Sequence, residues 1–374
     1  MRWREVRGAR VAHRTAFCAQ SLARARQHPL SGHRRLTETT DRPLVTFALF
    51  AYNQEQYIRE AVEGAFAQTY EPLEIILSDD CSTDQTFEIM KELAAAYKGP
   101  HEVQVRRNEY NQGTLAHILT AAHLARGEFM LVASGDDISL SERTKTMAQA
   151  MLMAPPDVVV ASADDIVFDD FGNTFDSERD VLRRRKSRAN DRIWFLGATA
   201  CFRTVDLCRL PFPSYRVLFE DLALMSIFRH LGKVSLRVES PLILRRAHSE
   251  NVGPIRLVEQ QDKWAHEARA LQMIASVSET YRYAADAISY FGGNADKQCK
   301  RSEFMREYAC WPDLSFPARV LLLAKSVRHG YARSVLIRLP GKNFLLFVKY
   351  LKSFLNDLLS LAKAVWRLAH RAVV

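Results

Sequence analysis

The chain has 374 residues, of which 48% are hydrophobic and 25% are charged, so it is long enough for one large globular core or two smaller ones. Its net charge of +9 is concentrated at the two ends, because residues 1–36 and 316–374 are strongly basic, which leaves the body between them acidic. An acidic body argues against a nucleic-acid enzyme, whose basic surface would line the site. The six cysteines form no C-x-x-C pair, which argues against a zinc site or a disulfide framework.

Strand-like and helix-like stretches alternate from residue 44 onward. Continuous apolar runs predict strands at 44–50, 73–77, 103–105, 129–134 and 157–162, and helical spacing of apolar residues predicts helices at 54–68, 84–97, 114–125 and 141–153. This alternation requires parallel strands joined by right-handed crossovers, with helices on both faces of the sheet. The sequence therefore predicts an α/β fold with a Rossmann-like, mostly parallel sheet.

The rest of the chain is less regular. Residues 163–190 are polar, which predicts an exposed loop, and a strand-like segment at 193–202, a helix at about 220–231 and a strand at 233–244 follow. Residues 256–310 are mostly helical by periodicity. In the tail, apolar side chains share one helical face and basic ones the other (Phe344, Val348, Leu351, Leu355, Leu358, Ala362 and Val365 against Lys349, Lys352, Lys363 and Arg367). This basic amphipathic helix either contacts an anionic membrane surface or packs on the body.

Two predicted strands break into adjacent aspartates, Asp79–Asp80 after the second strand and Asp136–Asp137 after the fourth. Adjacent carboxylates at the end of a buried strand are costly, because their charges repel and burial penalises both. Ligands of open α/β sheets bind at the carboxyl ends of the strands. The two acidic ends therefore predict a cation between them, and a divalent metal carrying a phosphorylated ligand satisfies that geometry.

The motifs resemble those of a family 2 glycosyltransferase with the GT-A fold. The resemblance covers about residues 43–253 and rests on FAYNQEQYIREAVEGAFAQTY, LSDDCSTDQT, NQGTLAHILTAAHLARGEFMLVASGDD, LFEDLALMSIF and LILRRAHSENVG, in that order. It implies an inverting, metal-dependent transfer of a sugar from a nucleotide diphosphate to an acceptor. The chain departs from the family at Ser134, where many relatives have an acid, and at Ile118–Leu119, where relatives often have an R-N pair.

The resemblance places the donor along the ends of the first strands. The residues that it implies for donor binding are Ala51, Tyr52, Asn53, Asp79, Asp80, Asp136 and Arg246. One of the first two aspartates, with Asp79 preferred, accepts the N3–H of a uracil or thymine ring, and Asp136 faces the ribose or a metal-bound water. Arg246 neutralises the leaving diphosphate, because a guanidinium suits bidentate phosphate contact. Ser82 and Asp84 are assigned to turn chemistry before the next helix.

The resemblance also implies a metal and a base. Asp137 is the expected direct ligand of Mn²⁺ or Mg²⁺, since these ions prefer carboxylate oxygen. His248 either completes the metal shell, contacts the diphosphate or is a structural histidine. Asp221, the second acid of an E-D pair, is the expected general base that takes the proton of the acceptor hydroxyl.

On the acceptor side, the resemblance implies Trp194 as a stacking face, Gly197 as a small residue that lets a sugar approach, and Glu220 as a second carboxylate. Simpler interpretations stay open for these positions. A packed core strand explains residues 194–197 almost as well, and acids in the first turn of a helix also interact favourably with its dipole.

On this interpretation residues 1–42 are a basic, disordered arm, 43–255 a GT-A domain, 256–315 a helical extension and 316–374 a basic amphipathic tail. The expected enzyme uses a UDP- or dTDP-sugar and a saccharide or lipid-linked acceptor in cell-surface polysaccharide biosynthesis. We expect it in the cytoplasm, peripheral at the inner face of the membrane, with no nucleic-acid partner. Two alternatives remain, a catalytically degenerate sugar-nucleotide-binding module and a nucleotidyltransferase. The turn AYNQEQ lacks the Gly-rich phosphate loop that the second alternative usually needs.

Overall fold

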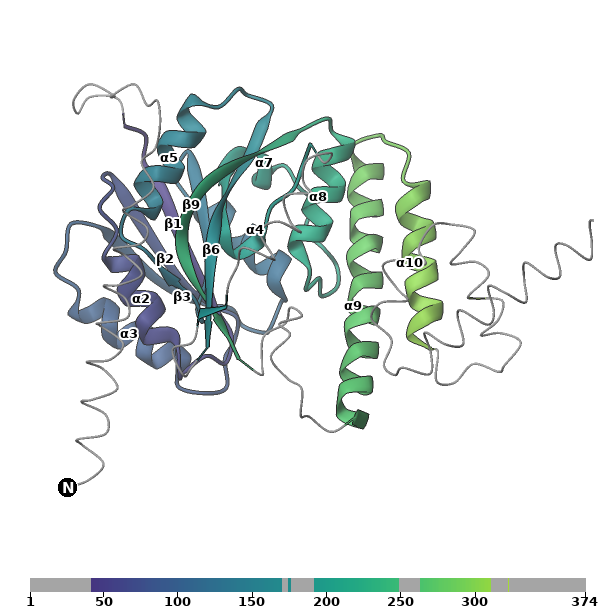
Figure 1. Ribbon diagram of the computed structural model, residues 1–374, viewed down its shortest axis with the longest axis horizontal. Helices are drawn as coiled ribbons and strands as arrows, with labels where there is room; N and C mark the ends of the chain where they lie inside the picture. The colour runs from purple at the N-terminus through teal and green to yellow at the C-terminus, as the bar shows by residue number, and fades with distance from the viewer. Residues whose placement is uncertain (1–41, 170–173, 176–191, 249–262, 311–321, 323–374) are drawn as a thin grey trace, which may run out of the picture. The chain divides into compact units, whose positions relative to one another are not determined.

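A computed structural model describes residues 42–169, 174–175, 192–248, 263–310 and 322 (Figure 1). The described residues fall into two compact units. The first contains residues 42–248, with the gaps given above, together with Glu279–Cys299, and the second contains the other described residues. Within these described residues, no helix combines the length and apolar character needed to cross a membrane.

The first unit is built on a nine-stranded sheet in the order β3-β2-β1-β4-β8-β6-β9-β5, with β7 beside β6. The strands are β1 (Val45–Ala51), β2 (Leu73–Asp79), β3 (Glu102–Arg107), β4 (Phe129–Ser134), β5 (Ile138–Ser139), β6 (Val158–Asp169), β7 (Thr174–Phe175), β8 (Ala200–Arg203) and β9 (Val234–Ala247). β1 to β4 are mutually parallel, and β6 is parallel to β9. β5, β7 and β8 pair antiparallel with their neighbours, so the sheet is mixed but mostly parallel.

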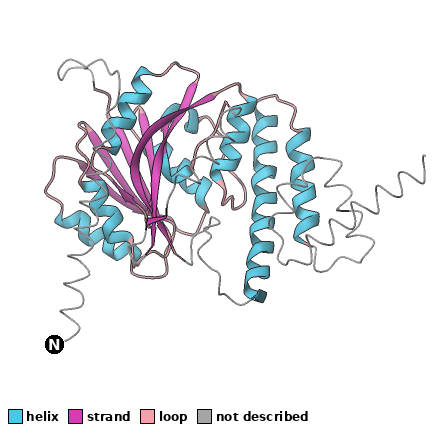
Figure 2. Ribbon diagram, in the orientation of Figure 1, coloured by secondary structure: helices cyan, strands magenta, loops and turns pink. Residues whose placement is uncertain are grey.

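Helices cover both faces of this sheet, as Figures 1 and 2 show. The helical elements are α2 (Ile58–Phe66), α3 (Thr86–Ala96), α4 (Thr114–Leu124), α5 (Arg143–Met153), the 3₁₀ turn η1 (Gly197–Thr199), α7 (Thr204–Cys208), α8 (Glu220–His230), α9 (Lys263–Tyr290) and α10 (Asp296–Ala309). Side chains of β1 alternate between two cores: Phe47 and Leu49 pack with α2 and α5, whereas Ala48 and Phe50 pack with α4 and α8. Every residue of β1 and β2 is buried, which explains their continuous apolar runs.

The predicted α/β fold is confirmed, and β4 has the bounds that its apolar run predicts. The prediction of an exposed loop from residue 163 is wrong at its start, because β6 continues to Asp169 beside β9. Its acids are paired there: Asp164 with Arg237 at 2.8 Å and Asp165 with Arg245 at 2.8 Å. The predicted arm at 1–42 and tail at 316–374 lie, apart from Arg42 and Leu322, outside the described residues.

Candidate donor and acceptor site

Four parallel strands end side by side at one edge of the sheet, which we call the carboxyl edge. The last residues of β1, β2 and β3 are in register, Ala51 opposite Asp79 and Asp79 opposite Arg107. On the other side of β1, Phe50 pairs with Ser134 at the end of β4. The predicted donor-side aspartates therefore lie along one edge, as the strand order requires.

The loops after β1 and β2 are joined by hydrogen bonds at this edge. Asn53 has a φ of 52°, a left-handed conformation that asparagine tolerates, and its N–H donates to Ser82 Oγ at 2.9 Å. Asp84 accepts the N–H groups of Glu55 at 3.0 Å and Thr86 at 2.9 Å. These contacts give Ser82 and Asp84 the turn chemistry predicted for them, and they fix Asn53 through its main chain.

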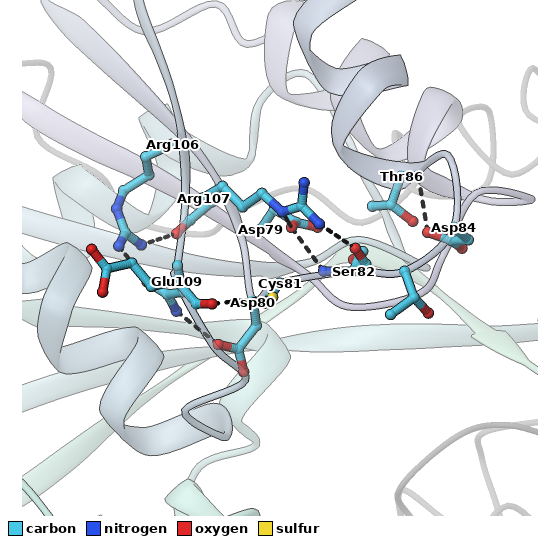
Figure 3. A network of polar contacts seen from close by, with 12 residues as sticks. Asp79, Asp80, Cys81, Ser82, Asp84, Thr86, Arg106, Arg107 and Glu109 are labelled. Atoms are coloured by element: carbon cyan, nitrogen blue, oxygen red, sulfur yellow. Dashed lines mark hydrogen bonds and ion pairs between the residues drawn. The ribbon is translucent and has the colours of Figure 1, made fainter.

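Asp79 keeps one carboxylate oxygen without a hydrogen-bond partner in the described part of the chain. The side chain is fully buried, and Oδ2 accepts the N–H of Ser82 at 2.9 Å and faces Arg107 Nε at 3.3 Å. Oδ1 is buried and receives no hydrogen bond. Figure 3 shows the Asp79 carboxylate beside the Arg107 guanidinium. A buried acceptor of this kind is costly unless a ligand supplies the donor.

Asp80, by contrast, uses both oxygens within the protein. Oδ1 accepts hydrogen bonds from Asn108 Nδ2 at 2.7 Å and the N–H of Gln112 at 2.9 Å, and Oδ2 accepts the N–H of Gly113 at 3.0 Å. In Figure 3 its carboxylate points away from Arg107. These contacts hold the segment 108–113, and the predicted contact of Asp80 with the donor stays a prediction.

The second aspartate pair lies between β4 and β9. Asp136 accepts a hydrogen bond from Ser134 Oγ, and its Oδ2 lies 3.0 Å from His248 Nε2. Although burial opposes the change, the hydrogen bonds from His248 and Ser134 lower the pKa of Asp136. Asp137 Oδ1 accepts the main-chain N–H of Arg246 at 2.9 Å, and burial, followed by the charge of Asp136, raises the pKa of Asp137 well above its usual value.

These residues fit a divalent cation in their chemistry. Among the described residues, no Lys or Arg side chain forms an ion pair with the buried Asp137, and a cation would supply the missing charge. The described residues contain no cluster of three or more metal-ligating side chains around one point. Mg²⁺ and Mn²⁺ sites commonly use one or two carboxylates with water and phosphate oxygens, so a site at Asp137 does not require a cluster of three protein ligands and stays a prediction.

Arg246 has partners other than those the sequence suggests. Its side chain is 1% exposed, its Nη2 pairs with Glu60 at 2.5 Å, and its guanidinium lies 4.9 Å from the Tyr57 ring centroid and 4.5 Å from that of Phe168. Its Nε also donates to the main-chain oxygen of Asp136 at 3.2 Å. These contacts anchor the Arg246 side chain within the protein, and its contact with a diphosphate stays a prediction.

The acceptor-side carboxyl groups lie at the start of α8. The Glu220 carboxylate occupies the space that a Cβ atom on Gly197 would need, so this glycine makes room for Glu220 and not only for an approaching sugar. Burial, followed by the charge of Asp221, raises the pKa of Glu220 to about 8. Burial also raises the pKa of Asp221, whose Oδ1 accepts the N–H of Leu222 at 2.7 Å.

Trp194 is anchored farther from the carboxyl edge. Its N–H donates to Ser235 Oγ at 2.8 Å, and its carbonyl accepts from the same hydroxyl at 2.9 Å. Ser235 is in register, through β6 and β8, with Met130 near the start of β4. The main chain of Trp194 therefore lies away from the ends of β1 to β4, and its stacking role stays a prediction.

Two arginines that the sequence reasoning missed complete the surroundings. Arg107 donates to the main-chain oxygen of Ser82 at 2.5 Å, besides facing Asp79, and lies over the Phe87 ring at 5.2 Å. Arg143 is fully buried between β4 and η1. Neither stands out in the sequence, because their contacts come from distant segments and follow no local period.

The fold is an α/β domain with two aspartate pairs at its carboxyl edge, and it can be compared with known sequences. Residues 46–209 match the sequence model of the family described as Glycosyl transferase family 2. The predicted resemblance to family 2 glycosyltransferases is thereby confirmed for these residues.

Two individual relatives have sequence identities of 28% and 32% to this chain. The Mycobacterium tuberculosis protein Rv1520 is 28% identical over 238 residues, 61% of this chain and 65% of that protein. The Escherichia coli UDP-Glc:alpha-D-GlcNAc-diphosphoundecaprenol beta-1,3-glucosyltransferase WfaP is 32% identical over 94 residues, 25% of this chain and 36% of WfaP. The matches thus span less than two thirds of either relative. The mannosyltransferase PcManGT from Pyrobaculum calidifontis, solved with GDP-Man and Mn²⁺, has a TM-score of 0.49 and 18% identity, over 92% of this chain and 94% of that one.

Proposed function

We propose that the protein is an inverting, metal-dependent glycosyltransferase that moves one sugar from a UDP- or dTDP-sugar to a saccharide or lipid-linked glycan. The observation that carries this proposal is Oδ1 of Asp79, which is buried and has no hydrogen-bond partner among the described residues, on the same sheet edge as the aspartate pair that follows β4. The match of residues 46–209 to the family 2 sequence model supports the reaction class.

The single available oxygen of the Asp79 carboxylate favours uracil or thymine as the nucleobase of the donor. Uracil and thymine present one ring N–H between two carbonyl oxygens, which matches one available acceptor. Guanine presents an adjacent ring N–H and amino group and needs two acceptors, but the second oxygen of Asp79 is already bonded to Ser82 and faces Arg107. Cytosine has no N–H at N3. A site with one buried acceptor rejects ligands that leave polar groups unpaired.

Asp137, with Asp136 and His248, would hold Mn²⁺ or Mg²⁺, which when bound neutralises the diphosphate leaving group. Asp221 supplies the base. Its raised pKa strengthens it as a proton acceptor, and the hydrogen bond from Leu222 N–H orients the carboxylate. One displacement assisted by one base, with no second carboxylate acting as nucleophile, inverts the anomeric centre.

A lipid-linked acceptor and a role in polysaccharide biosynthesis are supported by more distant facts. The name of WfaP gives a diphosphoundecaprenol-linked sugar as the acceptor of that relative. The basic ends of the present chain suit a peripheral position at an anionic membrane, where such an acceptor lies.

The test is a binding panel by calorimetry with UDP, 3-methyl-UDP, CDP and GDP in the presence of Mn²⁺. We expect UDP to bind at least ~10-fold more tightly than the other three, and Asp79→Asn to lose that preference. Tighter binding of GDP would contradict the assignment. Binding of UDP without turnover of any nucleotide sugar would identify the degenerate binding module instead.

A further inference from the structure

Arg143, the first residue of α5, is a fully buried arginine with no carboxylate partner among the described residues. Nη1 donates to Ser139 Oγ at 2.8 Å, while Nη2 donates to the carbonyl oxygens of Val132 at 2.7 Å and Ala198 at 2.9 Å. The guanidinium carbon lies 5.8 Å from the centroid of the Phe47 ring. Nε is buried without a hydrogen-bond partner within the described part of the chain.

This arrangement is expensive for a residue that serves stability alone. Removing a guanidinium from water is costly unless opposite charge and hydrogen bonds offset it. Here the hydrogen bonds go to neutral oxygens, and Asp137 acts on the guanidinium only through its charge, without a direct ion pair. A cation in the first turn of a helix also opposes the helix dipole. Apolar side chains of similar volume in such a position are often neutral or stabilising, so stability does not explain the residue.

The three oxygens that Arg143 binds belong to the two halves of the proposed site. Val132 and Ser139 bracket the acidic segment, two residues before Ser134 and two after Asp137. Ala198 follows Gly197, whose missing side chain gives the Glu220 carboxylate its space. The Arg143 guanidinium thus connects the main chain at Val132, on the metal side, to the turn at Ala198. The Glu220 carboxylate, on the acceptor side, packs against that turn.

We propose that Arg143 is a positioning residue that fixes the separation between the acidic segment 134–139 and the carboxyl groups at the start of α8. The inference rests on the proposed function for the roles of the two sides. Its structural content, the placement of Glu220 by way of the 197–198 turn, is independent of turnover.

Arg203 provides a matched control. Like Arg143, it donates to main-chain oxygens, those of Val158 at 3.0 Å and of Met151 and Ala154 at 3.3 Å. Unlike Arg143, it is only partly buried and has a carboxylate, that of Glu128, at 3.9 Å. It lies over a phenylalanine ring, Phe129, at 5.4 Å. However, Arg203 pairs with the first residue of β4, at the end of the strand opposite the carboxyl edge. Loss of this side chain removes similar contacts without touching the site.

The experiment compares Arg143→Met, Arg143→Lys and Arg203→Met in the full chain. Both methionine variants should lose stability in urea unfolding. Only Arg143→Met should lower kcat, by at least ~10-fold, with affinity for UDP and Mn²⁺ changed less than ~3-fold. Arg143→Lys should recover part of the kcat, because an ammonium still donates to the carbonyl oxygens. Carboxyl NMR should show the titration of Glu220 displaced in Arg143→Met and unchanged in Arg203→Met.

Equal kcat losses in the two methionine variants, or an unmoved Glu220 titration in Arg143→Met, would overturn the inference. Should Arg143→Met fail to fold, Arg143→Lys against Arg203→Lys gives the same comparison. A wild-type protein that transfers no sugar refutes the proposed function instead, and the Glu220 titration still decides the positioning role.

Discussion

At the scale of single residues, the proposed function gives the two adjacent carboxyl groups of α8 the chemistry that would distinguish an enzyme from a binding module. Asp221→Asn keeps the size and the oxygen that accepts Leu222 N–H, but removes the basicity. We expect kcat to fall at least ~10²-fold while the affinity for UDP stays within ~3-fold, as steady-state kinetics and calorimetry would measure. A parallel loss of UDP affinity would place Asp221 on the donor side.

The stability of the protein should depend on pH through Glu220, at the same helix start. Because its pKa is raised from 4.5 to about 8, the folded protein holds a proton between these values that the unfolded chain releases. The free energy of unfolding should therefore fall as pH rises through this window, by up to about 1.4 kcal/mol per pH unit. Glu220→Gln removes that contribution, so its stability relative to wild type should increase from pH 5 to pH 8 in urea unfolding. Parallel pH profiles for the two proteins would refute this account.

At the scale of elements, the connection between β3 and α4 depends on Asp80. Asp80→Ala leaves the donors of Asn108 and Gln112 without an acceptor, and the N–H of Gly113 keeps only Asn111 Oδ1 at 3.2 Å, at a cost of about 2 kcal/mol or more. Asp79→Ala instead removes an acceptor that is partly unused, so it should cost less stability but weaken UDP binding at least ~10-fold. Urea unfolding and calorimetry on the two variants test this contrast between neighbours. The reverse pattern would exchange their roles.

The elements also show what a sequence can and cannot predict. Continuous apolar runs made β1, β2 and β4 predictable, and their order placed Asp79 and Asp137 on one edge. The second half of β6 was not predictable, because its acids are matched by arginines of β9, about 80 residues away in the case of Asp165. The division of roles between Asp79 and Asp80 depends likewise on the backbone of a distant loop, which periodicity does not report.

At the scale of the whole molecule, the charge distribution separates an acidic body from two basic ends. The final 59 residues contain eleven Lys and Arg and one Asp, and the predicted helix there lies outside the described residues. Each cation near an anionic leaflet contributes about 1 kcal/mol, and an apolar helical face adds burial. The tail is therefore the part of the chain best suited to hold the enzyme near a lipid-linked acceptor.

Truncation after Pro340 tests this idea. We expect the full chain to cosediment with vesicles containing phosphatidylserine and to be released as salt rises, because exposed charges are screened within about 10 Å at 0.1 M salt. The truncated protein should lose most of this binding and its activity on a lipid-linked acceptor, yet keep its affinity for UDP, since the carboxyl edge lies within residues 45–137. A second truncation that removes residues 1–36 instead serves as a control that loses more charge, nine arginines and one acid against six Lys and Arg and one Asp after Pro340. Equal vesicle binding by the full chain and the Pro340 truncation would show that the tail helix packs on the body. The assignment of Asp79, Asp137 and Asp221 would be untouched by that result, because none of them depends on the tail.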